Sequence, residues 1–167
     1  YGEDPKYHWV DNFHTGYNLD SLKRYIVASG DRAFEPQLKR GFDFFKRHFV
    51  EPDGRPRYYH DRAMPIDIQC AAQAIDTLAF FAGDDPDALA LACRVADWTI
   101  ANMQDRDGHF YYRHLGWKKV KIPMYHWGQG TMFKALAHLA CQLKANEPKE
   151  DVPPVVAPRE EGQLAIR

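Results

Sequence analysis

The sequence has no apolar run close to the ~20 residues that a membrane-spanning helix requires. It also has no N-terminal signal-peptide pattern, and its first residue is Tyr1 instead of methionine. The opening segment is already rich in aromatic residues of the kind found in protein cores. We therefore expect a globular protein without a membrane segment, and we interpret the chain as a fragment of a longer one.

The sequence also has no excess of acidic over basic residues, or of basic over acidic ones. The 22 Lys and Arg residues and the 23 Asp and Glu residues leave a formal net charge of -1. This balance gives no reason to expect a nucleic-acid partner. A short basic cluster is formed by Lys118, Lys119 and Lys121, and we interpret it as a solvated loop, with a docking patch as the alternative.

Several motifs that carry chemistry are absent. There is no Gly-rich phosphate loop, no Gly-x-Ser-x-Gly elbow and no paired-cysteine zinc spacing, so we expect neither a cofactor nor a metal. The cysteines, Cys70, Cys93 and Cys141, are odd in number, and each sits among apolar residues. This pattern predicts buried free thiols in a reducing compartment, and hence a cytoplasmic protein.

Apolar residues recur with a helical period in five segments. The segments are about 15–28, 34–49, 66–82, 85–103 and 128–143. The second has one apolar stripe and one charged face, which predicts a peripheral helix, whereas the third is apolar or small on nearly every side, which predicts a central one. Peripheral and central helices are thus expected to alternate in a domain spanning 1–145, followed by a flexible, Pro- and charge-rich tail at 146–167.

The strongest signal is an internal repeat. Two Asp-Gly pairs lie 54 residues apart, and each is followed by a pair of tyrosines, a proline and a central helix with a glutamine near its start. Asp-Gly between aromatic residues favours a tight hairpin, because glycine readily adopts a positive φ. One such unit cannot bury its own faces, so neighbouring units must stack. The repeated residues are Asp53-Gly54 and Asp107-Gly108, Tyr58-Tyr59 and Tyr111-Tyr112, Pro65 and Pro123, and Gln73 and Gln129.

This pattern resembles the α/α-toroid superfamily, which includes six-hairpin glycosidases, polysaccharide lyases and the catalytic domain of uronyl epimerases. The resemblance rests on His14–Leu19, Pro65–Gln69 with Ala72–Ile75, Asp107–Gly108 with Tyr111–Tyr112, and Trp127–Gly130. It implies an all-α fold, a partial α/α toroid of alternating outer and inner helices with short β-hairpins between repeats. Since a full toroid has about six hairpins and this chain has fewer than half of them, it implies a C-terminal portion. A missing N-terminal half, or further copies of the chain, would complete the ring.

In such toroids, polar residues at one end of the inner helices line a cleft for a sugar chain. The resemblance implies a carbohydrate substrate and three catalytic candidates, Asp67, Tyr17 and His14. Aromatic faces stack on sugar rings, and side-chain amides donate hydrogen bonds to sugar hydroxyls and accept them. These two properties predict further substrate contacts. These are Asn18, Tyr59, Gln69, Gln73, His126, Trp127 and Gln129. The alternative for each is an ordinary helix cap or buried hydrogen bond.

The reaction class stays open at this point. Hydrolysis of a glycoside usually needs two carboxylates about 5–10 Å apart, and Asp11 is the only obvious companion of Asp67. A lyase or epimerase instead needs a Tyr or His base and an arginine such as Arg62 or Arg113. We therefore expect part of a carbohydrate-active hydrolase, lyase or epimerase. The alternatives are a non-catalytic scaffold or sugar-binding segment, and a terpene-cyclase-like toroid, for which the sequence has no Asp-rich motif.

Overall fold

The computed structural model describes residues 4–147. The predicted tail lies outside the described residues from residue 148 onward. No helix in the described part is long and apolar enough to cross a lipid bilayer. The elements are η1 (Pro5–Tyr7), α1 (Asn12–Ser29), α2 (Glu35–Phe49), β1 (Ile66–Asp67), α3 (Ile68–Phe80), α4 (Ala88–Met103), β2 (Arg113–His114), β3 (Lys119–Val120), the π-helical segment η2 (Tyr125–Gly130) and α5 (Thr131–Ala145).

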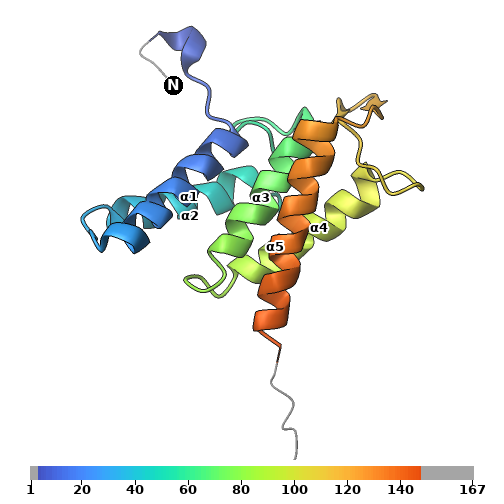
Figure 1. Cartoon of the computed structure of the whole chain (residues 1–167). Coiled ribbons are helices and arrows are strands. Elements are labelled where there is room, and N and C mark those ends of the chain that lie inside the picture. The colour runs from blue at the N-terminus through green and yellow to red at the C-terminus, as the bar shows by residue number, and fades with distance from the viewer. Residues whose placement is uncertain (1–3, 148–167) are drawn as a thin grey trace, which may run out of the picture.

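The helices form two layers. Helices α1, α3 and α5 lie side by side in one row, with α3 in contact with both of its neighbours, while α2 and α4 lie behind them (Figure 1). Each helix of the rear layer follows one of the front row in the chain, so the predicted alternation of inner and outer helices is confirmed. We call α1, α3 and α5 the inner helices and α2 and α4 the outer helices.

Helix α3 is the centre of the core. Eleven of its 13 residues are buried, which confirms the central position expected from its small and apolar side chains. Alanines let the neighbouring helices approach closely, while Ile75 and Leu78 fill the space between them and are fully buried. Burying one such aliphatic side chain stabilises the fold by roughly 1.5–3 kcal/mol.

Helix α2 buries only one stripe. Phe42, Phe45 and Phe49 face the core, and the ring of Phe42 stacks on Phe81 at 4.0 Å between centroids. Its charged residues remain on the outer side, as the amphipathic pattern predicts.

Three helix starts differ by three residues from the sequence-based expectation. Helix α1 begins at Asn12 because the side chain of Asp11 caps it, three residues before the expected start. Helix α4 begins at Ala88, because Asp85 closes a turn by accepting a hydrogen bond from the Asp87 backbone. The fifth helical segment, which is the third inner one, begins as η2 and becomes a regular α-helix only at Thr131.

Both Asp-Gly pairs form the predicted tight turns. Gly54 and Gly108 have φ values of 90° and 94°, which glycine adopts without steric cost. The arms of each turn pair through a single bridge, and the three-stranded sheet is built elsewhere, in the order β1-β2-β3 with antiparallel neighbours. The sheet therefore joins the start of the second inner helix to a separate β2–β3 hairpin that the sequence pattern does not predict.

The three cysteines are free thiols. Cys70 is fully buried and Cys93 is partly buried, but Cys141 is exposed on α5. The expectation of burial is thus wrong for Cys141, because the face of α5 that carries it has no neighbouring helix among the described residues.

Candidate active site at the rim of the inner helices

The amino-terminal ends of the inner helices lie together at one edge of the molecule (Figure 1). Asp11 is the N-cap of α1 and Asp67 is the N-cap of α3, while η2 leads into α5. Burial first, and then the charges of Asp67 and Asp11, raise the pKa of the fully buried Cys70 thiol. We call this edge the rim.

Asp11 holds the imidazole of His14. One carboxylate oxygen accepts a hydrogen bond from the His14 backbone at 2.8 Å, and the other lies 2.7 Å from His14 Nδ1. The Asp11 side chain is 1% exposed and that of His14 is 50% exposed. A buried carboxylate that binds Nδ1 fixes the ring orientation and makes Nε2 the basic nitrogen of the neutral imidazole. An imidazole held in this way can accept a proton from a bound molecule.

Aromatic rings surround His14. The Phe13 ring lies 4.4 Å away between centroids, and the rings of Trp9 and Tyr17 lie at 6.2 and 6.4 Å. The Tyr17 hydroxyl accepts a hydrogen bond from the Gln69 amide at 3.2 Å, which links α1 to α3 across the rim. Three predicted residues, His14, Tyr17 and Gln69, are therefore brought together.

Asp67 is bound on both oxygens. Its Oδ1 accepts a hydrogen bond from the Gln69 backbone at 2.9 Å, which caps α3, and its Oδ2 accepts from Arg113 Nε and Nη2 at 2.8 and 2.7 Å. The Asp67 side chain is only 5% exposed. The carboxylate thus closes the capping turn and fixes the guanidinium, which lies over the rings of Tyr112 and Tyr58.

A cavity of about 290 Å³ opens beside this pair. Its walls combine aromatic faces with an amide and an ion pair, which suits a sugar ring with one apolar and one polar side. Burial raises the pKa of Tyr58 to about 12, so its hydroxyl stays protonated at neutral pH and can donate a hydrogen bond. The lining residues are Phe13, Tyr58, Asp67, Gln69, Tyr112, Arg113, Met124 and Trp127.

A second layer of polar residues lies deeper on the inner helices. Asp20 and Asp76 each follow their capping aspartate by nine residues. Asp76 accepts from Lys134 and also contacts His138, while Asp20 accepts from the Gln73 amide at 2.9 Å. Burial, and then the charge of Asp76, raise the pKa of Asp20 to about 6. The predicted residue Gln73 therefore lies in this deeper layer.

Other predicted residues have different surroundings. Asn18 and His126 are exposed, and the His126 ring lies 4.5 Å from that of Trp127. Tyr59 lies next to Tyr58 and beneath Arg62, beside the cavity instead of in its lining. Their roles as substrate contacts stay predictions.

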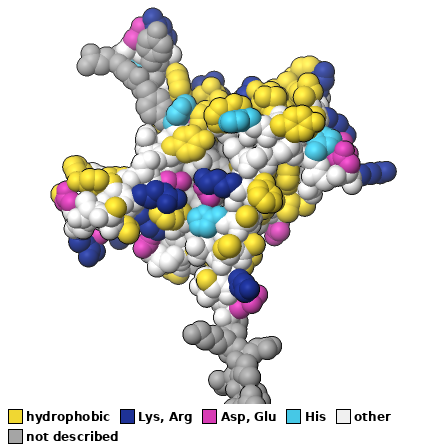
Figure 2. Space-filling view, in the orientation of Figure 1, with side chains coloured by type: hydrophobic (Ala, Val, Ile, Leu, Met, Phe, Trp, Pro, Cys, Tyr) yellow, Lys and Arg dark blue, Asp and Glu magenta, His cyan; other side chains and the backbone are white. Residues whose placement is uncertain are grey.

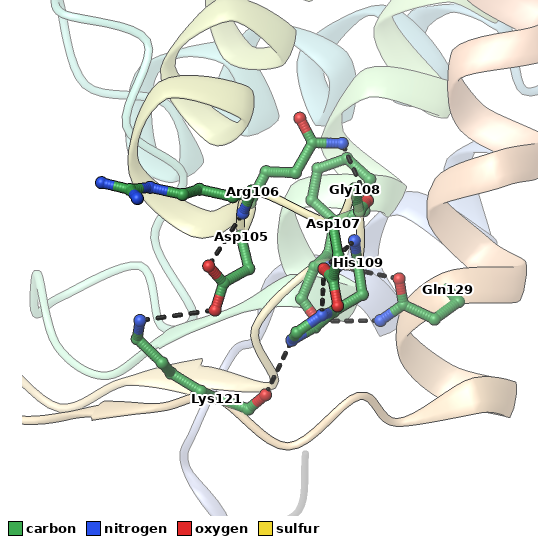
Figure 3. A network of polar contacts seen from close by, with 9 residues as sticks. Asp105, Arg106, Asp107, Gly108, His109, Lys121 and Gln129 are labelled. Atoms are coloured by element: carbon green, nitrogen blue, oxygen red, sulfur yellow. Dashed lines mark hydrogen bonds and ion pairs between the residues drawn. The ribbon is translucent and has the colours of Figure 1, made fainter.

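Gln129 binds protein backbone. Its amide oxygen accepts from Phe110 N and its amide nitrogen donates to Phe110 O, both at 2.8 Å. Figure 3 shows this clamp together with His109, whose ring bridges Asp107 and the carbonyl of Lys121. The network attaches the second Asp-Gly turn to η2 and to Lys121, the residue that follows β3, and it uses both polar atoms of the Gln129 amide.

Sequence reasoning missed two pairings at the rim. The sequence-based prediction treats Asp11 only as a second carboxylate, although its spacing from His14 places a cap and an imidazole one turn apart. It treats Arg113 only as a substrate contact, whereas the bond of Arg113 to Asp67 joins residues 46 positions apart. A local pattern signals the first pair, whereas only the folded chain reveals the second.

Comparison with known proteins supports the fold. No protein-family model and no curated protein matches the chain. A solved structure of cellobiose 2-epimerase from Spirochaeta thermophila DSM 6192 is similar, with a TM-score of 0.64 and 16% sequence identity. The match covers 81% of this chain and 39% of the epimerase chain. The chain therefore has the fold of a partial α/α toroid and spans well under half of this neighbour.

Proposed function

We propose that the chain is part of a carbohydrate-active toroid enzyme in which His14 removes a carbon-bound proton from a saccharide, as an epimerase or a lyase does. The observation that carries this proposal is the pairing of His14 Nδ1 with the buried carboxylate of Asp11 at 2.7 Å. A general base needs a fixed ring and access to the substrate, and a half-exposed imidazole on a buried carboxylate has both.

The bonding of the rim carboxylates argues against glycoside hydrolysis. That reaction needs one carboxyl group as an acid and a second as a base or nucleophile. Here Asp11 is bound by His14 and Asp67 by Arg113, and both also cap helices. Both carboxylates are therefore already engaged by protein groups, which argues against a direct role for either on a substrate.

Inversion of a carbon centre beside a carbonyl group fits the same residues. The base takes the proton from that carbon, and the electron pair moves onto the carbonyl oxygen as an enediolate. A proton from solvent then adds to the opposite face of the carbon as the carbonyl group re-forms. A lyase would start with the same abstraction and end by expelling the group on the next carbon. The neighbour of similar fold is named as a 2-epimerase of a disaccharide, which supports the first of these outcomes.

Exchange of the carbon-bound proton with solvent tests this proposal. The intact protein is incubated in D₂O with cellobiose and with an oligogalacturonide, and deuterium at the sugar carbons is followed by NMR. We expect incorporation beside the carbonyl or carboxylate group, and we expect His14→Gln to slow it by about 100-fold or more, the usual contribution of a general base.

His48→Gln is the matched control, because His48 lies on outer helix α2 and stacks on Phe44. Its exchange rate should equal that of the unmodified protein. An unmodified protein that binds either sugar without any exchange would favour the non-catalytic sugar-binding alternative, and hydrolysis products without exchange would show that the reaction class is wrong.

A further inference from the structure

The last quarter of the described chain has an unusual charge distribution. Residues 108–146 contain no aspartate and no glutamate, although the whole chain carries a net charge of -1. The basic residues of this stretch are Arg113, Lys118, Lys119, Lys121, Lys134 and Lys144. Any carboxylate that neutralises them must come from another part of the fold.

Three of these cations have carboxylate partners from elsewhere. Arg113 binds Asp67, Lys134 binds Asp76 at 2.7 Å, and Lys121 lies 3.4 Å from Asp105 in the network of Figure 3. These positive charges are balanced within the protein.

The turn of the β2–β3 hairpin keeps its positive charge. Lys119 Nζ donates to the backbone carbonyl of Asn102 at 2.7 Å, which leaves its charge unneutralised. Lys118 is exposed, and no carboxylate among the described residues pairs with it. Burial, and then the charges of Lys119 and Arg55, lower the pKa of His114 at the base of the hairpin, which agrees with a positive potential there.

The same turn presents a tryptophan to solvent. Trp117 is 83% exposed, the largest exposed fraction among the exposed large hydrophobic side chains of the described residues. The turn is closed by a 2.8 Å hydrogen bond from Leu115 N to Lys118 O, and Gly116 supplies the required φ of 91°. The ring therefore stands on a defined turn beside two lysines.

The hairpin is continuous with the rim cavity. Strand β2 contains Arg113, which lines the cavity, and Trp117 follows four residues later, within about 13 Å along an extended chain. Past the hairpin, Ile122, Tyr125 and Trp127 are 62%, 81% and 50% exposed. Figure 2 shows hydrophobic side chains gathered along this edge, with histidines between them.

We infer that the β2–β3 turn is a second binding site for the saccharide, and that it takes a negatively charged unit such as a uronate or a sulfated sugar outside the rim cavity. The indole face of Trp117 stacks on the sugar ring, and Lys118 and Lys119 attract its anionic group. This inference rests on the proposed function, because it assumes that a saccharide occupies the rim. It makes the substrate an extended acidic chain.

Binding measurements on the intact protein test the inference. An oligogalacturonide and a cello-oligosaccharide of the same length are titrated by calorimetry at low and high salt. We expect the acidic chain to bind more tightly, with an advantage that falls as salt screens the lysines. Trp117→Ala should weaken binding of the acidic chain about tenfold, and Trp117→Tyr, which retains a ring face, should restore most of it.

Lys118→Gln should weaken only the acidic chain, by roughly threefold at low salt. Lys144→Gln is the matched control, since Lys144 is an exposed lysine of the same acid-free stretch at the far end of α5, and it should have no effect. Equal binding of both chains, or unaltered binding by the Trp117 and Lys118 variants, would overturn the inference. Equally tight binding of a single-stranded DNA would also overturn it, by revealing a general polyanion surface.

The two proposals fail in different ways. A protein that binds neither sugar contradicts the proposed function itself. A protein that exchanges deuterium through His14 but binds both chains alike, with no contribution from Trp117, contradicts only the second site.

Discussion

The first and second repeats place the same residue types at the same positions and give them different surroundings. Gly54 and Gly108 close equivalent turns, Asp11 and Asp67 cap equivalent helices, and these caps lie 56 residues apart. The Gly54 turn packs against α4, where an added Cβ would lie 2.3 Å from the Arg94 carbonyl oxygen, whereas nothing lies within 4 Å of the same position at Gly108. The repeat determines the backbone, and the neighbouring elements determine the role of each residue.

The caps differ in the same way. Asp11 binds an imidazole on its own helix, three residues away, while Asp67 binds a guanidinium from a strand that arrives much later in the chain. One aspartate therefore orients a proposed base, and the other connects α3 to the sheet. The following substitutions test this difference, in order of decreasing expected effect.

The largest effect is expected at the turns. Gly54→Ala combines an unfavourable positive φ with a clash against the Arg94 carbonyl, and should lower the free energy of unfolding by about 3 kcal/mol. Gly108→Ala carries only the backbone cost and should lose about 1–2 kcal/mol. Urea denaturation of both variants measures the difference, and equal losses would show that the two turns are not packed differently.

Substitution of one capping aspartate should mainly lower stability, and substitution of the other should mainly lower activity. Asp67→Asn retains a capping side chain but removes the charge that faces Arg113, so we expect a loss of about 2 kcal/mol in unfolding free energy, after allowance for the partial exposure of Arg113. Asp11→Asn should change stability by less than about 1 kcal/mol and slow deuterium exchange about 100-fold. Denaturation and NMR exchange are measured on each variant. A stability loss at Asp11 as large as that at Asp67 would contradict the assigned roles.

The deeper aspartates should differ in their pH dependence. Burial, and then the charge of Asp76, raise the pKa of Asp20 from its ordinary value of 3.8 to about 6, so the folded state retains a proton that the unfolded chain releases. The contribution of Asp20 to the free energy of unfolding is therefore fully present below about pH 4, falls as the pH rises, and is lost above about pH 6. Asp20→Asn should abolish this slope and raise the unfolding free energy at pH 7 by about 1 kcal/mol.

Asp76→Asn is the comparison for Asp20→Asn. It removes the partner of Lys134 and His138, so it should lower stability at pH 7. Denaturation curves between pH 4 and 8 distinguish the two variants, and an unchanged slope in Asp20→Asn would show that Asp20 is not the titrating group.

The fold was largely predictable because its signals are local. The apolar stripe of α2 and the small residues of α3 determine which helix is outer and which is inner, and Asp-Gly determines both turns. The β2–β3 hairpin was not predictable in this way, since its strands have two residues each and show no alternation.

The candidate site was predictable in its location but not in its pairings. Helix starts indicate which polar residues reach the rim, and His14, Tyr17 and Gln69 do meet there. The partners of Asp67 and Gln129 come from chain segments 46 and 19 residues away, and no periodicity specifies such contacts. The sequence therefore predicts which residues lie at the rim, and the tertiary structure determines which of them are bound by other protein groups.

The π-helical segment η2 has a consequence for how the rim can change. A π turn accommodates one residue more than a regular helical turn, and the N-cap of η2 is Met124, whereas aspartates, Asp11 and Asp67, cap α1 and α3. The extra length is absorbed before Thr131, so Met132, Ala135 and Leu139 keep their places in the core. An insertion or deletion at this turn would redirect His126 and Trp127 while the packing below stays in register. The third rim position is thus the one where the surface of the rim can vary at the smallest cost to the fold.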